Sequence, residues 1–190
     1  MISIIIPAYN EEKALPETLR HSLAQSGVYE VIVVDGGSTD RTVEVAEEFG
    51  FEVLGSRLSE GHKARSVVCE TGDVNLERRT SNCQRLLIIS APKGRATQMN
   101  AGAKEARGEW LLFLHADTWL PDSALVRLNQ MEGDANVQAG GFLHQFSGDD
   151  WRLRMISFLD NFRCLRSRII YGDQAMFVRR ALFERLGGFP

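Results

Sequence analysis

Short apolar runs alternate with amphipathic segments over the first 114 residues of this 190-residue sequence, and this alternation is its strongest constraint on the fold. Such runs are typical of strands buried on both faces. They cover Ile2–Ile6, Val31–Val34, Phe51–Leu54, Leu86–Ser90 and Trp110–Leu114. Apolar residues at helical spacing lie between them, over Glu11–Gln25, Thr39–Phe49 and Arg95–Arg107. Strands that alternate with helices predict a Rossmann-like α/β fold, with a mostly parallel central sheet flanked by helices.

The composition is that of a soluble globular protein, with 44% apolar and 25% charged residues. It excludes a disordered, collagenous or integral-membrane protein, and the length fits one domain over residues 1–190. A formal charge of −3 gives no electrostatic reason to expect a nucleic-acid partner. The three cysteines form no CxxC pair, and no targeting segment precedes the first apolar run. We therefore expect a cytoplasmic protein.

Two parts of the chain depart from the alternation. Residues 55–85 mix charged with isolated apolar residues, which predicts a mobile surface insertion with one hairpin. After Pro121 the apolar runs become less regular. The elements predicted there are helices over Asp122–Met131, Trp151–Leu165 and Arg180–Leu186, and strands over Val137–Phe146 and Ala175–Val178.

The loop after the first strand, Pro7-Ala8-Tyr9-Asn10-Glu11-Glu12, allows two interpretations. In the simpler one, Asn10 caps the following helix and the two glutamates occupy its first turn. In the functional one, Tyr9 and the loop backbone form one wall of a base pocket. Ligands of parallel α/β sheets bind beyond the carboxyl ends of the strands, which is where this loop lies.

The loops after the second and last of these strands carry acids. Asp35 directly follows a buried strand and precedes Gly36-Gly37, which would let a ligand approach the backbone closely. Ser38 or Asp40 can cap the next helix, and the Glu44 side chain can reach back to the backbone of the capping residue. The loop is not GxGxxG, which disfavours a dinucleotide fold.

His115 and Asp117 follow the Trp110–Leu114 run and point the same way in extended chain. They are a candidate pair for a divalent ion that carries phosphate oxygens. A buried hydrogen-bonded pair with no ligand is the alternative.

These loops, with the segment Lys93-Gly94-Arg95-Ala96-Thr97-Gln98-Met99-Asn100-Ala101-Gly102, together resemble the family 2 glycosyltransferases of GT-A fold. Ile2–Glu12 and Val31–Asp40 match the two nucleotide-binding signatures of that family, and Phe113–Thr118 stands where its Asp-x-Asp metal motif belongs. The resemblance resumes over Tyr171–Gln174 and continues to Pro190. Four blocks in the same order make the resemblance specific. The motifs at residues 94–103 and 113–118 are most similar to those of a bacterial branch of the family whose substrate is unassigned.

The resemblance implies a transferase with a nucleotide-sugar half over residues 1–120 and an acceptor half over 121–190. Its donor would be a UDP- or GDP-type sugar, and a divalent metal, Mg²⁺ or Mn²⁺, would bridge the diphosphate. The residues it assigns to the nucleotide and donor sugar are Pro7, Ala8, Tyr9, Glu11, Asp35, Gly37, Arg95, Gln98, Asn100 and His115. It places Gly172 and Gln174 on the acceptor side, and leaves the acceptor unknown, with a lipid-linked one among the candidates.

Two departures from the family pattern concern the chemistry. His115 replaces the first acid of Asp-x-Asp, so the metal depends on Asp117. An inverting transfer also needs a carboxylate base, which the family supplies shortly after the segment that ends here at Pro190. Three alternatives follow: the chain is a fragment, another acid serves as the base, or the chain does not catalyse. Asp173 is the candidate for another acid. Asp173 also fits acceptor binding or a loop hydrogen bond.

The basic stretch 151–168 has two interpretations as well. Its apolar face, with Trp151, Phe158 and Phe162, packs on the core, or it lies on a membrane surface and brings the enzyme to a lipid acceptor. For the whole chain the alternatives to a metal-dependent, inverting transferase are a non-catalytic sugar-nucleotide-binding protein and, third, a nucleotidyltransferase. The last would need a Gly-rich triphosphate loop, which Pro7-Ala8-Tyr9-Asn10 is not.

Overall fold

The computed structural model describes residues 1–54, 59–60, 67–70, 83–131, 133–143, 145–146, 148, 150–167, 169–170 and 174–190. The strands within these ranges are β1 (Ile2–Ala8), β2 (Tyr29–Asp35), β3 (Ser59–Glu60), β4 (Val67–Glu70), β5 (Cys83–Ser90), β6 (Trp110–Phe113), β7 (Ala139–Gly140) and β8 (Phe177–Arg179). The helices are α1 (Leu15–Leu23), α2 (Thr42–Leu54), α3 (Arg95–Glu105), α4 (Ala124–Gln130), α5 (Trp151–Ser167) and α6 (Arg180–Leu186).

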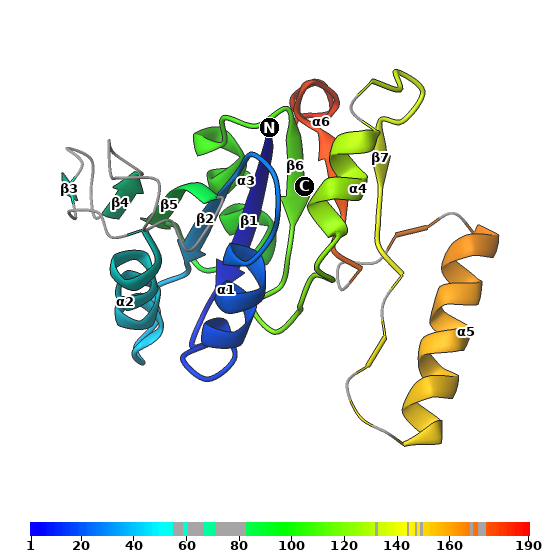
Figure 1. Ribbon diagram of the computed structural model, residues 1–190, viewed down its shortest axis with the longest axis horizontal. Coiled ribbons are helices and arrows are strands. Elements are labelled where there is room, and N and C mark those ends of the chain that lie inside the picture. Colours follow the sequence, from blue (N-terminus) through cyan, green and yellow to red (C-terminus); the bar gives the residue numbers. More distant parts are fainter. Residues whose placement is uncertain are drawn as a thin grey trace.

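The described strands form one sheet in the order β3-β4-β5-β2-β1-β6-β8-β7 (Figure 1). The four central strands, β5, β2, β1 and β6, are parallel. At one side β4 pairs antiparallel with β5 and β3 pairs antiparallel with β4. At the other side β8 pairs antiparallel with β6 and β7 pairs antiparallel with β8. The prediction of a mostly parallel α/β sheet is confirmed. Its parallel strands end at one side of the molecule, so the loops after β1, β2 and β6 come together there.

Hydrophobic layers cover both faces of the sheet. Alternate residues of β1 belong to different layers: Ile4 packs with α1 and α4, and Ile5 packs with α3 and α6. Helix α3 approaches the sheet closely at Gly102, where a Cβ atom would lie 2.5 Å from Cγ2 of Ile5. A larger residue at this position would therefore push α3 off the sheet.

At the amino end of the parallel strands, a buried ion pair holds three strands together. The Glu30 carboxylate accepts from the Ser3 hydroxyl at 2.6 Å and from the Arg107 backbone N–H at 2.6 Å. Arg85 donates to its other oxygen at 3.1 Å. Glu30 is only 1% exposed, so its charge depends on these partners.

Several predicted element boundaries are wrong. Helix α1 begins at Leu15, with Pro16 in its first turn, so Asn10 does not cap it and Glu11 and Glu12 precede it. Proline is tolerated in a first turn and not in the helix interior that the prediction required. Phe51–Leu54 is the last turn of α2 and not a strand. Four apolar residues are too few for periodicity to separate the two, and a helix passes Gly50 at a cost of about 1 kcal/mol.

The insertion and the second half show further differences. Part of residues 55–85 does form one hairpin, because β3 pairs with β4, but β4 also extends the main sheet beside β5. Residues 55–58, 61–66 and 71–82 lie outside the described residues. Of the described part of the strand predicted over Val137–Phe146, only Ala139–Gly140 pairs as β7.

Helix α5 stands apart from the sheet and its covering helices (Figure 1). Of its residues only Ser157 is buried, and the apolar side chains Trp151, Phe158 and Phe162 are all more than half exposed. The prediction that this apolar face packs on the core is therefore wrong. None of the helices in the described ranges is long and apolar enough to cross a membrane.

Candidate functional site

Two loops at the carboxyl end of the sheet are joined by reciprocal hydrogen bonds. The Asn10 backbone N–H donates to Ser38 Oγ at 2.9 Å, and Asn10 Oδ1 accepts from the Thr39 backbone N–H at 2.9 Å. The next residue, Glu11, donates its backbone N–H to Thr42 Oγ1 at 2.8 Å. Asn10 takes a left-handed conformation with φ of 57°, which asparagine tolerates better than most residues. The bonds hold the loop after β1 against the loop after β2.

The following residues continue this contact. The Glu12 backbone N–H donates to Asp40 Oδ2, and the Arg41 backbone N–H donates to the Glu12 carboxylate, each at 3.2 Å. Desolvation opposes ionisation of Asp40, but hydrogen bonds from Thr42 outweigh it and lower the pKa of Asp40. Asp40 also accepts the Thr42 backbone N–H at the start of α2, as predicted of a cap, whereas Glu44 pairs with Arg41 and does not reach back.

Asp35 ends β2 as a buried carboxylate, 5% exposed. It accepts the backbone N–H of Gly37 at 3.0 Å and of Ser38 at 3.1 Å. Gly37 has φ of 85°, a conformation that strongly favours glycine, and no atom lies within 4 Å of where its Cβ would be. The turn therefore leaves open space over its backbone, next to a charged group that the protein holds in place.

The two amide side chains of α3 that were assigned to the donor make internal contacts. Gln98 is 4% exposed and donates to the carbonyl oxygens of Ala8 and Val34, both at 2.8 Å. It ties the ends of β1 and β2 beneath the loops. Asn100 holds the backbone of Phe189, donating to its oxygen and accepting its N–H, each at 2.9 Å. Both side chains are therefore bonded to backbone within the protein.

Charged side chains of four segments interact at the strand ends. Burial raises the pKa of Glu11, and the nearby charges of Asp117 and Asp40 raise it further, against an opposite effect of Arg95. Lys93 lies 3.8 Å from the centre of the Tyr9 ring, a cation–π contact that covers one face of the tyrosine. Arg95 opens α3 as an exposed side chain, as expected.

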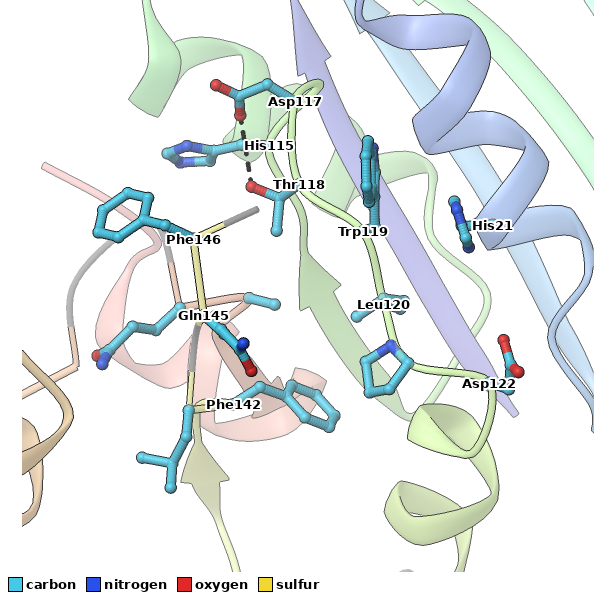
Figure 2. Close-up of a pocket in the computed structure, with 14 residues that line it drawn as sticks. His21, His115, Asp117, Thr118, Trp119, Leu120, Asp122, Phe142, Gln145 and Phe146 are labelled. Carbon is cyan, nitrogen blue, oxygen red and sulfur yellow. Dashed lines mark hydrogen bonds between the residues drawn. The ribbon is translucent and has the colours of Figure 1, made fainter. Parts of the chain in front are cut away.

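Asp117 and His115 lie on the loop after β6 and line a pocket of about 720 Å³ (Figure 2). Asp117 is exposed and accepts a long hydrogen bond from Thr118, whereas His115 is half-buried. Within the described residues, no three His, Cys, Asp or Glu side chains group closely enough to hold a metal. The oxygen chemistry at this end still fits Mg²⁺ or Mn²⁺, because Mg²⁺ needs only one or two carboxylates when substrate phosphates and water supply the rest.

Aromatic rings also line this pocket. Trp119 stacks on His21 with ring centres 5.3 Å apart, and Phe142 and Phe146 lie on the opposite side (Figure 2). The sequence pattern indicates no role for the Trp119–His21 pair or for Lys93. A tryptophan two residues after Asp117 was the available signal, but His21 belongs to α1, almost 100 residues away.

The acceptor-side residues are placed only in part. Gln174 is 2% exposed and lines the pocket, and its backbone oxygen accepts the Phe142 N–H at 2.7 Å. Gly172 and the candidate base Asp173 lie outside the described residues.

Comparison with known proteins gives consistent matches. Residues 3–68 and 70–187 match the family model described as Glycosyl transferase family 2. A PGL/p-HBAD biosynthesis glycosyltransferase of Mycobacterium bovis is 31% identical over 194 residues, which cover 100% of this chain and 63% of the relative. An undecaprenyl-phosphate 4-deoxy-4-formamido-L-arabinose transferase of Pseudomonas aeruginosa is 26% identical, over 98% of this chain and 49% of its own length. The chain thus spans less than two thirds of these relatives.

Solved structures share the fold over 100% of the chain. A mannosyltransferase from Pyrobaculum calidifontis, in complex with GDP-Man and Mn²⁺, has a TM-score of 0.69 at 23% identity, over 47% of its length. Residues 1–349 of S. aureus TarS, in complex with UDP-GlcNAc, have a TM-score of 0.66 at 20% identity, over 48% of that chain.

Proposed function

The chain belongs to glycosyl transferase family 2, and on this basis we propose that it transfers a sugar from a nucleotide-diphosphate donor to an acceptor hydroxyl, with inversion and with a divalent metal. The observation that carries the proposal is the pair of carboxylates at the carboxyl end of the sheet. Asp35 is fixed by backbone N–H groups, and Asp117 is exposed beside a pocket. Parallel α/β sheets bind their ligands at this end.

In this proposal the joined loops after β1 and β2 hold the nucleoside. Asp35 accepts a hydrogen bond from the base, and the open backbone at Gly37 lets the nucleotide approach. Pro7, Ala8 and Tyr9 bracket base and ribose, and Glu11 accepts from the ribose hydroxyls. Because the two loops are already held together, little order has to be gained when the nucleotide binds.

The diphosphate lies between Arg95 and Asp117 in this proposal. Arg95 contributes positive charge, and the amino terminus of α3 attracts anions. Asp117 would hold Mg²⁺ or Mn²⁺, and the ion would supply positive charge to the diphosphate as the leaving group. His115 contacts sugar or phosphate, because hard cations prefer oxygen ligands. Gln98 and Asn100 act as positioning residues, through the strand ends and the Phe189 backbone respectively.

We place the transferred sugar and the acceptor in the aromatic pocket. Trp119 and Phe146 offer flat apolar surfaces there, and Asp117 lies at the same pocket, so a sugar can reach both. Asp173 is the candidate base, and its sequence neighbour Gln174 lines the pocket. A lipid-linked acceptor is in keeping with the relative whose name includes undecaprenyl phosphate. This acceptor fits a protein on the cytoplasmic face of a membrane.

Calorimetric titration with UDP and GDP, each with and without Mn²⁺, tests the donor site. We expect one diphosphate to bind, more tightly with Mn²⁺, and the Asp117→Asn variant to lose the effect of Mn²⁺ while it keeps the weaker metal-free binding. A response to Mn²⁺ that survives in this variant would exclude Asp117 as the ligand. Absence of binding under every condition would refute the donor site itself.

Release of the nucleoside diphosphate from the matching nucleotide sugar then separates transfer from binding alone. We expect turnover in the parent protein and none after Asp173→Asn, with unchanged diphosphate affinity. Binding without turnover, in the presence of lipid extracts and simple glycosides as acceptors, would favour the alternative of a non-catalytic sugar-nucleotide-binding protein.

A further inference from the structure

Helix α5 presents a broad apolar surface to solvent. Trp151, Phe158 and Leu165 are 65%, 67% and 66% exposed, and Met155, Leu159 and Phe162 are exposed beside them. At 100° per residue, these six side chains fall within about one third of the helix circumference. They form one continuous surface, which we call the α5 face, along a 17-residue helix. Contiguous exposed apolar surfaces of this kind mark sites of interaction.

The opposite side of α5 attaches the helix to the rest of the chain. Ser157 is buried there, and its hydroxyl accepts the Phe146 backbone N–H at 3.0 Å. Leu153 and Cys164 are partly buried on the same side. The helix is thus anchored by its less apolar side, next to a residue that lines the candidate site, and the α5 face is left outward.

Positive charge borders the α5 face. The helix contains four arginines and one aspartate, so its net charge is +3 in a chain whose total is −3. Asp160 is already paired with Arg163 at 3.1 Å. Arg154 borders the face along one side and Arg152 along the other, while Arg166 lies within the same third of the circumference, at the carboxyl end of the helix. Such long side chains can keep their charge at a polar surface while their stems cover apolar surface.

We propose that the α5 face binds the surface of an anionic membrane, with its aromatic rings in the headgroup and acyl boundary and its arginines on lipid phosphates. The charge complementarity selects this occupant, because a second copy docking α5 against α5 would bring two helices of charge +3 together. Helices that lie in the plane of a membrane have this pattern, with tryptophan, phenylalanine and leucine on one face and arginine beside them. Vesicle binding needs no nucleotide and no acceptor, so this inference is independent of the proposed sugar transfer.

Sedimentation with vesicles tests the inference on the full chain. The probes are vesicles of phosphatidylcholine with 30% phosphatidylglycerol and vesicles of phosphatidylcholine alone. We expect binding to the anionic vesicles to be tighter by about tenfold or more, because each arginine near an anionic surface adds to the affinity. Binding should weaken as salt is added. Equal binding to both compositions, or none to either, would overturn the proposal.

Variants separate the α5 face from other apolar surface. The pair Phe158→Ser and Phe162→Ser should reduce vesicle binding at least about tenfold. The matched pair Val28→Ser and Leu186→Ser, which are also exposed but lie elsewhere, should leave binding unchanged. Thermal unfolding checks that both pairs remain folded. Unchanged binding in the α5 pair would overturn the proposal. So would a parent dimer that the same pair converts to a monomer, because a second copy would then be the occupant.

Discussion

The two ends of the parallel strands use buried acids in different ways, and β2 carries one of each. Glu30, at its start, is closed into a network with Arg85 and other groups, and the network lies wholly within the protein. Asp35, at its end, is held, among the residues that the structure describes, only by backbone N–H groups of its own loop, under open space at Gly37. Both acids are buried, so burial alone does not separate the acid that closes the strand starts from the one that we propose binds the nucleotide. Their partners do.

We call the amino end of the parallel strands, with Glu30, the closed end, and the carboxyl end, with Asp35, the open end. The largest expected effect comes from breaking the network at the closed end. Glu30→Ala leaves the Arg85 charge buried without its carboxylate, which should lower the free energy of unfolding by about 3–5 kcal/mol. Urea denaturation measures the loss. Replacing Glu30 and Arg85 together by methionine should recover part of it, because no isolated charge then remains. If the double variant were no more stable than Glu30→Ala, the buried charge would not be the cause.

Asp35→Asn tests the open end and should give the reverse pattern. The amide keeps one oxygen for the loop N–H groups but loses the charge, so we expect stability to fall by about 1 kcal/mol. Affinity for the nucleoside diphosphate should fall by about tenfold or more, as expected when a charge-assisted hydrogen bond worth about 1.5–3 kcal/mol is lost. Calorimetric titration measures it. The comparison would fail if Asp35→Asn left this affinity intact.

A smaller effect is expected where the two loops of the open end join. Asn10→Gly keeps the left-handed backbone but removes the hydrogen bond to Thr39, whereas Asn10→Ala also strains the backbone. We expect Asn10→Gly to cost about 0.5–1.5 kcal/mol and Asn10→Ala about 1 kcal/mol more. Denaturation gives both values. Equal losses would mean that the conformation of Asn10 contributes little.

The parallel core could be predicted from the sequence because its signal is local. Each buried strand is a short apolar run, and an acid that directly follows such a run, such as Asp35, must lie at the strand end. The positions of the loops after β1, β2 and β6 follow from the same pattern. The order of helix and strand was therefore recovered, while the start of α1 and the identity of Phe51–Leu54 were not.

The direction of side chains on α3 could not be predicted. Gln98 and Asn100 lie on α3 near the carboxyl end of the sheet, but which of them points outward depends on how the helix is rotated against the sheet. The contacts that fix this rotation, with Ala8, Val34 and Phe189, come from distant parts of the chain. For α5 the amphipathic pattern indicated an apolar face correctly, but a pattern within one helix cannot say whether the protein covers that face.

The smallest effect expected at the open end is that of Glu11, whose pKa is raised by burial and by the charges of Asp117 and Asp40. Below the ordinary pKa of about 4.5 the group is protonated in both the folded and the unfolded state, so it has no effect on stability. As the pH rises from there through the higher folded-state pKa, the unfolded chain ionises first, and the folded protein loses stability.

Glu11→Gln removes this loss, so the variant should be more stable than the parent at pH 7, by no more than about 0.5 kcal/mol, and equal to it below pH 4. Denaturation across this range gives the difference, and its disappearance at low pH distinguishes it from a packing effect. Mg²⁺ at pH 7 should stabilise the parent more than the variant, because a cation beside Asp117 offsets the repulsion that raises the pKa of Glu11. If the free energy of unfolding of the two proteins followed the same curve against pH and Mg²⁺ concentration, Glu11 and Asp117 would not share one electrostatic site. The acids of the open end would then act separately.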